Sequence, residues 1–192
     1  IKGPLDRAAY QSAWQLMVDR HAALRTMFVW QDEKEPLKIV RERLVLPWTE
    51  HDWQDLAPHE RESAVDELLA ADRSQGFDML QPPLRRLNLI QLDDVKHVLV
   101  WSVHHLIIDR WCNAILFNEL RVAYEAAVAG ERAHLPPAPR FRDYISLLEE
   151  RDNDAKRTFW QESLQDISAR PILLQKQVMD SAPRLDQIEI AL

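Results

Sequence analysis

The chain has 192 residues, which is enough for one domain with a sizeable hydrophobic core. Hydrophobic residues make up 46% of it and charged residues 29%, the balance of an ordinary globular domain. The formal net charge of −7 argues against a nucleic-acid-binding protein, which needs a basic surface patch. No apolar stretch approaches the ~20 residues of a membrane span. The single cysteine, Cys112, excludes an internal disulfide and a cysteine-based zinc site.

The start of the chain lacks the charged residues, apolar core and cleavage site that follow one another in a secretory signal peptide. It begins at Ile1 without a methionine, so we expect a piece of a longer polypeptide. Together with the single cysteine, this favours a cytoplasmic location over a secreted protein.

The first part of the chain predicts one helix followed by short strands. Asp6 is a good helix N-cap, and the apolar residues behind it recur at helical spacing, which predicts a helix over about 7–24. β-Branched and aromatic residues predict a strand over 26–30, and residues 37–40 are the candidate return strand of a hairpin. Residues 46–53 form a short extended piece.

The middle of the chain predicts a second helix and two paired strands. The helix starts at Ala57 or Pro58 and covers about 58–74, and Gly76 is a plausible C-terminal stop. The runs 84–92 and 97–105 are separated only by "DDVK", residues 93–96, so they are expected to be antiparallel neighbours. The second run is apolar on both faces, which is typical of a central strand.

The last part of the chain predicts a helix over about 112–130 and another long helix over 141–164. The end is less defined: residues 165–192 are a linker or a strand, and the alternation over 187–192 favours a strand. The whole pattern predicts an α/β fold, in which helices pack on a mixed β-sheet.

The stretch "SVHHLIIDRW", residues 102–111, carries the main candidate site. His104 and His105 end an apolar strand, so their rings are expected to point to opposite faces of the sheet. Asp109 follows four residues after His105, across a turn that leads into a helix.

Three interpretations compete for this arrangement. Two structural histidines would each need a hydrogen-bond partner, since an unpaired buried polar group costs about 1–3 kcal/mol. A metal site is disfavoured because His104 points away from His105 and Asp109, and no third histidine or cysteine completes the ligand set. A Ser-His-Asp triad lacks an elbow serine, whereas an Asp–His pair for general base chemistry stays open.

Two blocks resemble one known family. "HHLIID" at 104–109 resembles the histidine-histidine-x-x-x-aspartate signature of nonribosomal peptide synthetase condensation domains, which belong with the chloramphenicol acetyltransferase-like enzymes. "RHAALRTMF" at 20–28 is similar to a second signature of that family. The opening "GPLD" and the later "FRDYISLLEE…FW" also fit. The resemblance runs in order from Gly3 to about Leu164.

The resemblance implies an acyltransferase of two lobes with a tunnel between them. Donor and acceptor carrier proteins dock at opposite mouths, and each presents a substrate on a phosphopantetheine arm. The amine of the acceptor aminoacyl thioester attacks the donor acyl or peptidyl thioester, and an amide forms. The domain itself is expected to bind no cofactor or metal, and it works beside other synthetase domains in making secondary metabolites such as antibiotics.

The same resemblance implies the roles of the site residues. His105 is the active-site histidine, and His104 supports it. Asp109 is structural and is commonly held by an arginine. Arg25, from the second signature, is the matching arginine, so we expect it to pair with Asp109.

Two departures from the family pattern stand out. Arg110 occupies the place of a glycine that usually follows the aspartate, so its guanidinium would narrow the tunnel, contact a polar substrate or simply point to solvent. The chain is also less than half as long as a full condensation domain. We therefore expect residues 1–192 to be the N-terminal lobe, truncated at both ends. Trp101 and Trp111 flank the signature and are candidate tunnel-lining residues, as is Arg110.

Three functions are weighed against one another. The first is the amide-forming lobe of a condensation domain. The second is a catalytically silent domain of the same fold that docks or recruits carrier proteins. The third is an acyltransferase of the same superfamily that makes esters from acyl-CoA, which the block at 20–28 disfavours.

Overall fold

The computed structural model describes residues 1–31, 34–150 and 153–165. The chain divides into two compact units, residues 1–146 and residues 147–192. The expected strand at 187–192 lies outside the described residues. All the described strands and the site described below lie within residues 1–146, the first unit.

A three-stranded mixed sheet forms the middle layer of the first unit. Its order is β3-β4-β5, with β3 parallel to β4 and β4 antiparallel to β5. The mixed sheet and the antiparallel pair of long strands are confirmed. The bounds are β3 (Trp48–Asp52), β4 (Arg85–Asp93) and β5 (Lys96–Val103).

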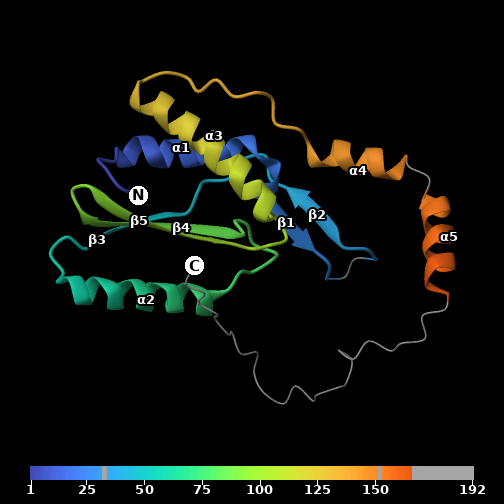
Figure 1. Ribbon diagram of the computed structural model, residues 1–192, viewed down its shortest axis with the longest axis horizontal. Coiled ribbons are helices and arrows are strands. Elements are labelled where there is room, and N and C mark those ends of the chain that lie inside the picture. Colours follow the sequence, from blue (N-terminus) through green and yellow to red (C-terminus); the bar gives the residue numbers. More distant parts are fainter. Residues whose placement is uncertain (32–33, 151–152, 166–192) are drawn as a thin grey trace, which may run out of the picture. The chain divides into compact units, whose positions relative to one another are not determined.

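The strand that leads to the histidines, β5, was expected to be central. This expectation is wrong: in the described sheet β4 is central and β5 lies at the edge. Helices cover both faces of the sheet, so an edge strand also becomes apolar on both faces. Helices α1 (Arg7–Arg20) and α3 (Arg110–Val128) lie on one face, and α2 (Pro58–Gln75) lies on the other (Figure 1).

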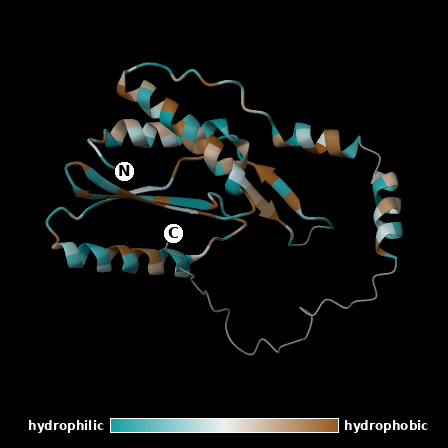
Figure 2. Cartoon of the chain, viewed as in Figure 1, coloured by the Kyte–Doolittle hydropathy of each residue, from teal (hydrophilic) through white to brown (hydrophobic). Residues whose placement is uncertain are grey.

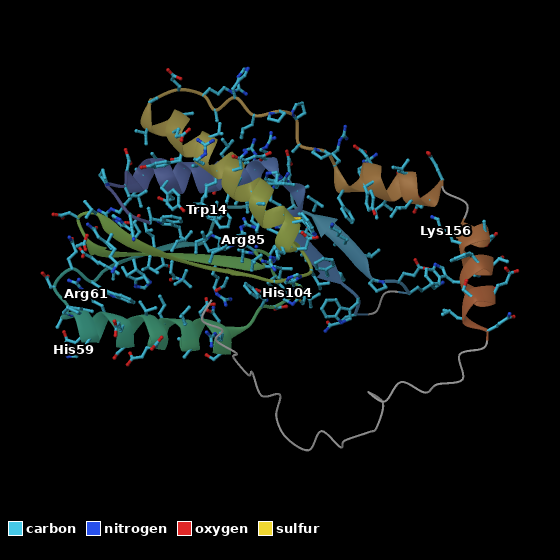
Figure 3. All side chains as sticks on the ribbon, viewed as in Figure 1. Trp14, His59, Arg61, Arg85, His104 and Lys156 are labelled. Atoms are coloured by element: carbon cyan, nitrogen blue, oxygen red, sulfur yellow. The ribbon has the colours of Figure 1, made fainter. Side chains whose placement is uncertain are left out.

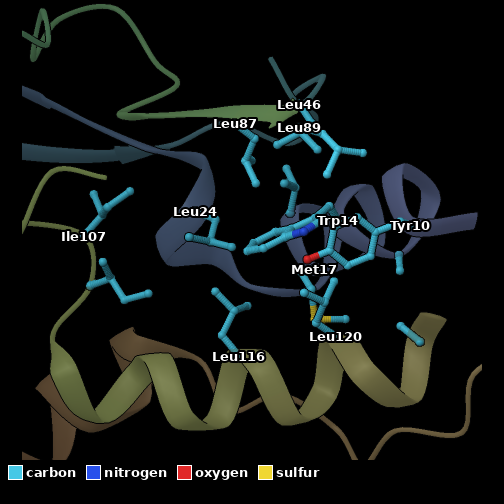
Figure 4. Close-up of a cluster of buried hydrophobic side chains, with 14 of the residues drawn as sticks. Tyr10, Trp14, Met17, Leu24, Leu46, Leu87, Leu89, Ile107, Leu116 and Leu120 are labelled. Atoms are coloured by element: carbon cyan, nitrogen blue, oxygen red, sulfur yellow. The ribbon is translucent and has the colours of Figure 1, made fainter. Parts of the chain in front are cut away.

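The main core lies between the sheet and the α1–α3 layer. Trp14 of α1 is fully buried at its centre, where its ring packs against Trp101 at 5.3 Å and Phe117 at 5.9 Å between ring centroids. Leu116 and Leu120 of α3 close the cluster from the other helix (Figure 4). These contacts fix α3, and with it the segment between β5 and α3, against the sheet.

Helix α1 begins where the sequence predicts and ends earlier. The Asp6 carboxylate accepts the Ala9 N–H at 2.9 Å, as expected of an N-cap. The α-helix ends at Arg20 because His21 takes an extended backbone, and a 3₁₀ turn, η1 (Ala22–Arg25), follows. The expected continuous helix to residue 24 is therefore interrupted.

Helix α2 covers the opposite face of the sheet. Its apolar residues Val65, Leu68 and Leu69 pack against Ile90 and neighbouring side chains, which confirms the predicted apolar side. The helix stops at Gly76, whose φ of 59° lies in the left-handed region that glycine adopts without strain.

The remaining elements are a hairpin and two helices. The predicted hairpin is present, with β1 (Thr26–Val29) antiparallel to β2 (Leu37–Val40). The single long helix expected over 141–164 is wrong: the described residues form α4 (Phe141–Glu149) and a separate α5 (Asn153–Leu164). Brown, apolar positions interrupt the polar surface of α4 (Figure 2).

None of the described helices has both the length and the apolar composition needed to cross a membrane.

Candidate active site

A tight turn at the end of β5 presents the histidine pair, of which His104 is labelled in Figure 3. The backbone N–H of His104 donates to the Leu84 carbonyl at 2.9 Å, which holds this residue to the end of β4. The Ile107 N–H then donates to the His104 carbonyl at 3.1 Å, which closes a four-residue turn. His105 therefore lies at the tip of the turn, and its side chain is exposed.

The two rings have different surroundings, and both lie just beyond the last residue of β5, Val103. His104 is half-buried, and its ring meets the ring of Phe77 edge to face at 6.2 Å, on the α2 side of the sheet. The Leu106 N–H donates to His104 Nδ1 at 3.2 Å. A neutral ring whose Nδ1 accepts a hydrogen bond carries its proton on Nε2.

Asp109 lies just beyond the turn and caps helix α3. Its carboxylate accepts the backbone N–H of Cys112 at 2.9 Å. Hydrogen bonding from Cys112 lowers the pKa of the exposed Asp109 carboxyl, and the charge of nearby His105 acts in the same direction. The carboxylate thus stays ionised next to the exposed histidine.

The expected pair between Arg25 and Asp109 does not form within the described part of the chain. Arg25 donates instead to backbone carbonyls, including those of Val18 at 3.0 Å and Glu42 at 3.0 Å. These bonds tie the end of η1 to α1 and to the segment after β2. The reason for the difference lies with Arg25, because its Nε, Nη1 and Nη2 all donate to backbone carbonyls.

A second arginine, Arg85, was missed by the sequence reasoning. It is fully buried on the α1–α3 face of β4 and donates Nη1 to the Leu24 carbonyl (Figure 3). Its Nε and Nη2 have no hydrogen-bond partner among the described residues, and burial lowers its pKa to about 10. One sequence pattern indicated the burial of Arg85. It lies two residues before Leu87 and four before Leu89, which are core residues on the same face of the strand.

The three candidate tunnel-lining residues have different environments. Trp101 is half-buried and packs between Trp14 and Phe117 in the core. Trp111 is 84% exposed on the first turn of α3, beside the exposed Arg110. Of the two tryptophans, Trp111 therefore offers more surface to a ligand.

An apolar surface surrounds the histidine turn. Leu106 at its tip and Ile115 on α3 are 58% and 59% exposed. Next to them, a mostly apolar pocket of about 200 Å³ opens between η1 and the start of α3, with Ile108, Cys112 and Glu119 in its wall. Across residues 1–31, 34–150 and 153–165, no cluster of three or more His, Cys, Asp or Glu side chains is arranged to hold a metal ion.

Comparisons with known proteins define the class. The family model of the condensation domain matches residues 1–192, so the chain belongs to the condensation domain family. A linear gramicidin synthase protein from Brevibacillus parabrevis is 37% identical over 164 residues, which make up 85% of this chain and 2% of that protein. The resemblance found in the sequence is confirmed.

Solved structures show the same fold. The starter condensation domain of rhizomide synthetase RzmA has a TM-score of 0.75 at 16% identity, over 88% of this chain and 41% of that one. The X-domain in complex with OxyB from teicoplanin biosynthesis has a TM-score of 0.66 at 27% identity, over 86% and 37%. The expected chloramphenicol acetyltransferase-like α/β fold is confirmed, and the chain spans less than half of each protein named here.

Proposed function

We propose that residues 1–192 form the N-terminal lobe of a nonribosomal peptide synthetase condensation domain that joins two carrier-bound substrates through an amide bond. Membership of the condensation family and the match to a gramicidin synthase support this function. The partners are the donor and acceptor carrier proteins, whose phosphopantetheine arms bring the substrates, together with a second lobe and neighbouring synthetase domains.

The reaction needs one proton to leave and one thiol to depart. The acceptor amine attacks the carbonyl carbon of the donor thioester and forms a tetrahedral, zwitterionic intermediate. Collapse of this intermediate breaks the carbon–sulfur bond and releases the donor's phosphopantetheine thiol, while the ammonium nitrogen loses its proton. A neutral imidazole can accept that proton or hydrogen-bond the intermediate.

The observation that carries the proposal is the exposed ring of His105 at the tip of the turn. Backbone hydrogen bonds from His104 and Ile107 hold the turn, and the structure describes no hydrogen bond from the His105 ring to another described side chain. The ring is therefore free to bind a substrate, whereas His104 is turned toward the protein. We assign the chemistry to His105 and supporting roles to His104 and Asp109, whereas Arg25 acts only on the backbone, through its bonds to the carbonyls of Val18 and Glu42.

Positioning supplies a large part of the rate in this proposal. An α-amino group has an ordinary pKa of about 7.7–8.0, so an appreciable fraction is already neutral near neutral pH. Deprotonation of the amine before attack then lowers the activation free energy by only about 1 kcal/mol. Holding the two tethered substrates together lowers it more. Arg110 and Trp111 are both exposed at the start of α3, which supports a role for them in lining the substrate path.

The test is amide formation by a complete condensation domain that carries this chain. Loaded donor and acceptor carrier proteins are mixed with it, and the dipeptidyl thioester is followed by mass spectrometry. Accumulation of the dipeptidyl thioester on the acceptor carrier supports the proposal. Absence of product, with both carriers still bound, would favour the recruitment function.

A silent recruitment domain is the second candidate, and two observations favour it. Arg110 replaces the residue where the family pattern has glycine, and it lies exposed on the first turn of α3. The X-domain found in complex with OxyB shares the fold at 27% identity. Replacing Arg110 by glycine separates the two: a gain of condensation from an inactive domain would show that Arg110 blocks the tunnel.

A further inference from the structure

Arg86 fastens the end of α2 to the sheet with all three of its guanidinium nitrogens. Nε donates to Asp72 Oδ1 at 2.7 Å, and Nη2 donates to the Asp72 backbone carbonyl at 2.8 Å. Nη1 donates to the Gly76 carbonyl at 2.6 Å, just past the end of the helix. A planar guanidinium bound on three sides has little freedom to rotate.

The carboxylate of Asp72 extends this contact to β5. Its Oδ2 accepts the hydroxyl of Ser102, which lies directly opposite Arg86 in the β4–β5 register. The side chains of Arg86 and Asp72 are only 18% and 9% exposed. Ser102 precedes His104 by two residues, so both side chains point to the α2 face of the sheet.

Phe77 links this cluster to the histidine. The Arg86 guanidinium carbon lies 4.2 Å from the centroid of the Phe77 ring, within cation–π range. The Phe77 ring also meets the ring of His104, edge to face at 6.2 Å and 83°. The half-buried Phe77 ring thus lies between a fixed cation and the imidazole.

From these contacts we propose that Phe77, held in place by Arg86, is a positioning residue that fixes the ring of His104. The Phe77 ring restricts rotation of the imidazole. The Leu106 N–H then favours the tautomer whose unprotonated Nδ1 accepts its hydrogen bond. Because His104 begins the turn that carries His105, an ordered His104 keeps the exposed ring at one place. The consequence for catalysis rests on the proposed function, whereas the order of His104 does not.

The test follows the nitrogen resonances of His104 in the chain labelled with ¹⁵N-histidine. Spectra are recorded at about pH 8, above the ordinary histidine pKa of ~6.5, and the His104 signals are assigned by their loss in His104→Gln. The native chain is expected to show an unprotonated Nδ1 and a protonated Nε2. In Phe77→Leu the two signals should move toward each other as the tautomers mix.

Phe77→Tyr is expected to restore the native pattern, because it keeps the ring between Arg86 and His104. Phe141→Leu is the matched control: Phe141 also lies under a cation, with Lys38 Nζ 3.8 Å from its ring centroid, and has no described contact with His104. Unchanged His104 signals in folded Phe77→Leu would overturn the proposal. If that variant does not fold, the same spectra are recorded for Arg86→Lys. Unchanged His104 signals in Arg86→Lys would also overturn the proposal.

The rate of condensation by a complete domain is the second measurement. Phe77→Leu should slow amide formation roughly 2- to 10-fold, the loss expected for one aromatic contact. A rate equal to that of the native domain, with altered His104 signals, would overturn the catalytic consequence. Failure of the proposed function would be seen separately, as the absence of amide formation by the native domain.

Discussion

At the scale of single residues, the site depends on backbone geometry more than on side-chain pairs. His105 is exposed because His104 and Ile107 close the turn beneath it, and His104 is oriented by Leu106 and Phe77. The signature in the sequence identified these histidines. It did not reveal Phe77. This residue lies in the loop after α2, far from His104 in the sequence, and such a contact leaves no local sequence pattern.

The role of Asp109 gives a residue-scale prediction. As an N-cap, Asp109 should be replaced with little loss by asparagine, which caps equally well, whereas alanine removes the acceptor for the Cys112 N–H. Thermal unfolding should therefore give a lower Tm for Asp109→Ala than for Asp109→Asn. Equal losses in both variants would point instead to a charge pair such as the one expected with Arg25.

The Asp72 carboxylate gives a pH-dependent prediction. The pKa of Asp72 is lowered in the folded chain; burial alone would raise it, but the bonds from Arg86 and Ser102 outweigh burial. In the unfolded chain an aspartate has a pKa near 3.9, so around that pH the unfolded state binds more protons. The resulting stability is present above about pH 4 and is lost as the pH falls through the lower folded pKa.

Asp72→Asn should therefore lower the free energy of unfolding at pH 7 by about 1–3 kcal/mol and flatten its fall in acid. Urea unfolding at several pH values measures both effects. A variant with the native pH dependence would show that Asp72 is not ionised in this contact.

At the scale of elements, local patterns were sufficient where local chemistry decides. The cap at Asp6, the stop at Gly76 and the hairpin at 26–40 all appeared in the sequence. The break at His21 did not appear there, and the contacts made at this point are not local: the Glu119 carboxylate accepts Arg20 Nε at 2.7 Å and contacts His21 Nε2 at 2.7 Å. Neither could the edge position of β5 be read from its apolar faces.

The Glu119 contact gives an element-scale prediction. Glu119 joins α1 to α3 and its side chain is only 12% exposed, whereas Glu125 pairs with Arg121 on the same helix and is 59% exposed. Glu119→Gln should lower the Tm clearly, because it weakens a partly buried bidentate contact, and Glu125→Gln should change it little. Equal Tm values for the two variants would contradict this account of the α1–α3 layer.

At the scale of the whole molecule, the chain is a condensation-family member that spans 41% of the solved RzmA domain. The residues Leu106, Trp111 and Ile115 near the turn are apolar and exposed, as expected of a surface that the proposed second lobe would cover. The family and the fold were accessible from two short blocks and the alternation of helices and strands. The burial of Arg85 was indicated only by its alternation with Leu87 and Leu89 along β4, which does not show how the α1–α3 layer covers that face.

The isolated chain is expected not to condense substrates, because one lobe cannot hold two tethered thioesters together. The measurement compares dipeptidyl thioester formed by residues 1–192 with that formed by a complete domain, at equal concentrations of loaded carriers. Comparable turnover by the two proteins would show that the second lobe is not needed for catalysis.

The most direct test of the proposed function is the single-turnover rate of a complete domain in which His105 is replaced by alanine. The account predicts a rate reduced by roughly 10²–10⁴-fold, the range for a positioned acid–base group, with an unchanged Tm because the His105 side chain is exposed. His59→Ala, an exposed histidine on α2, is the matched control and should retain the native rate. A His105→Ala domain that forms the amide at the native rate would contradict the account.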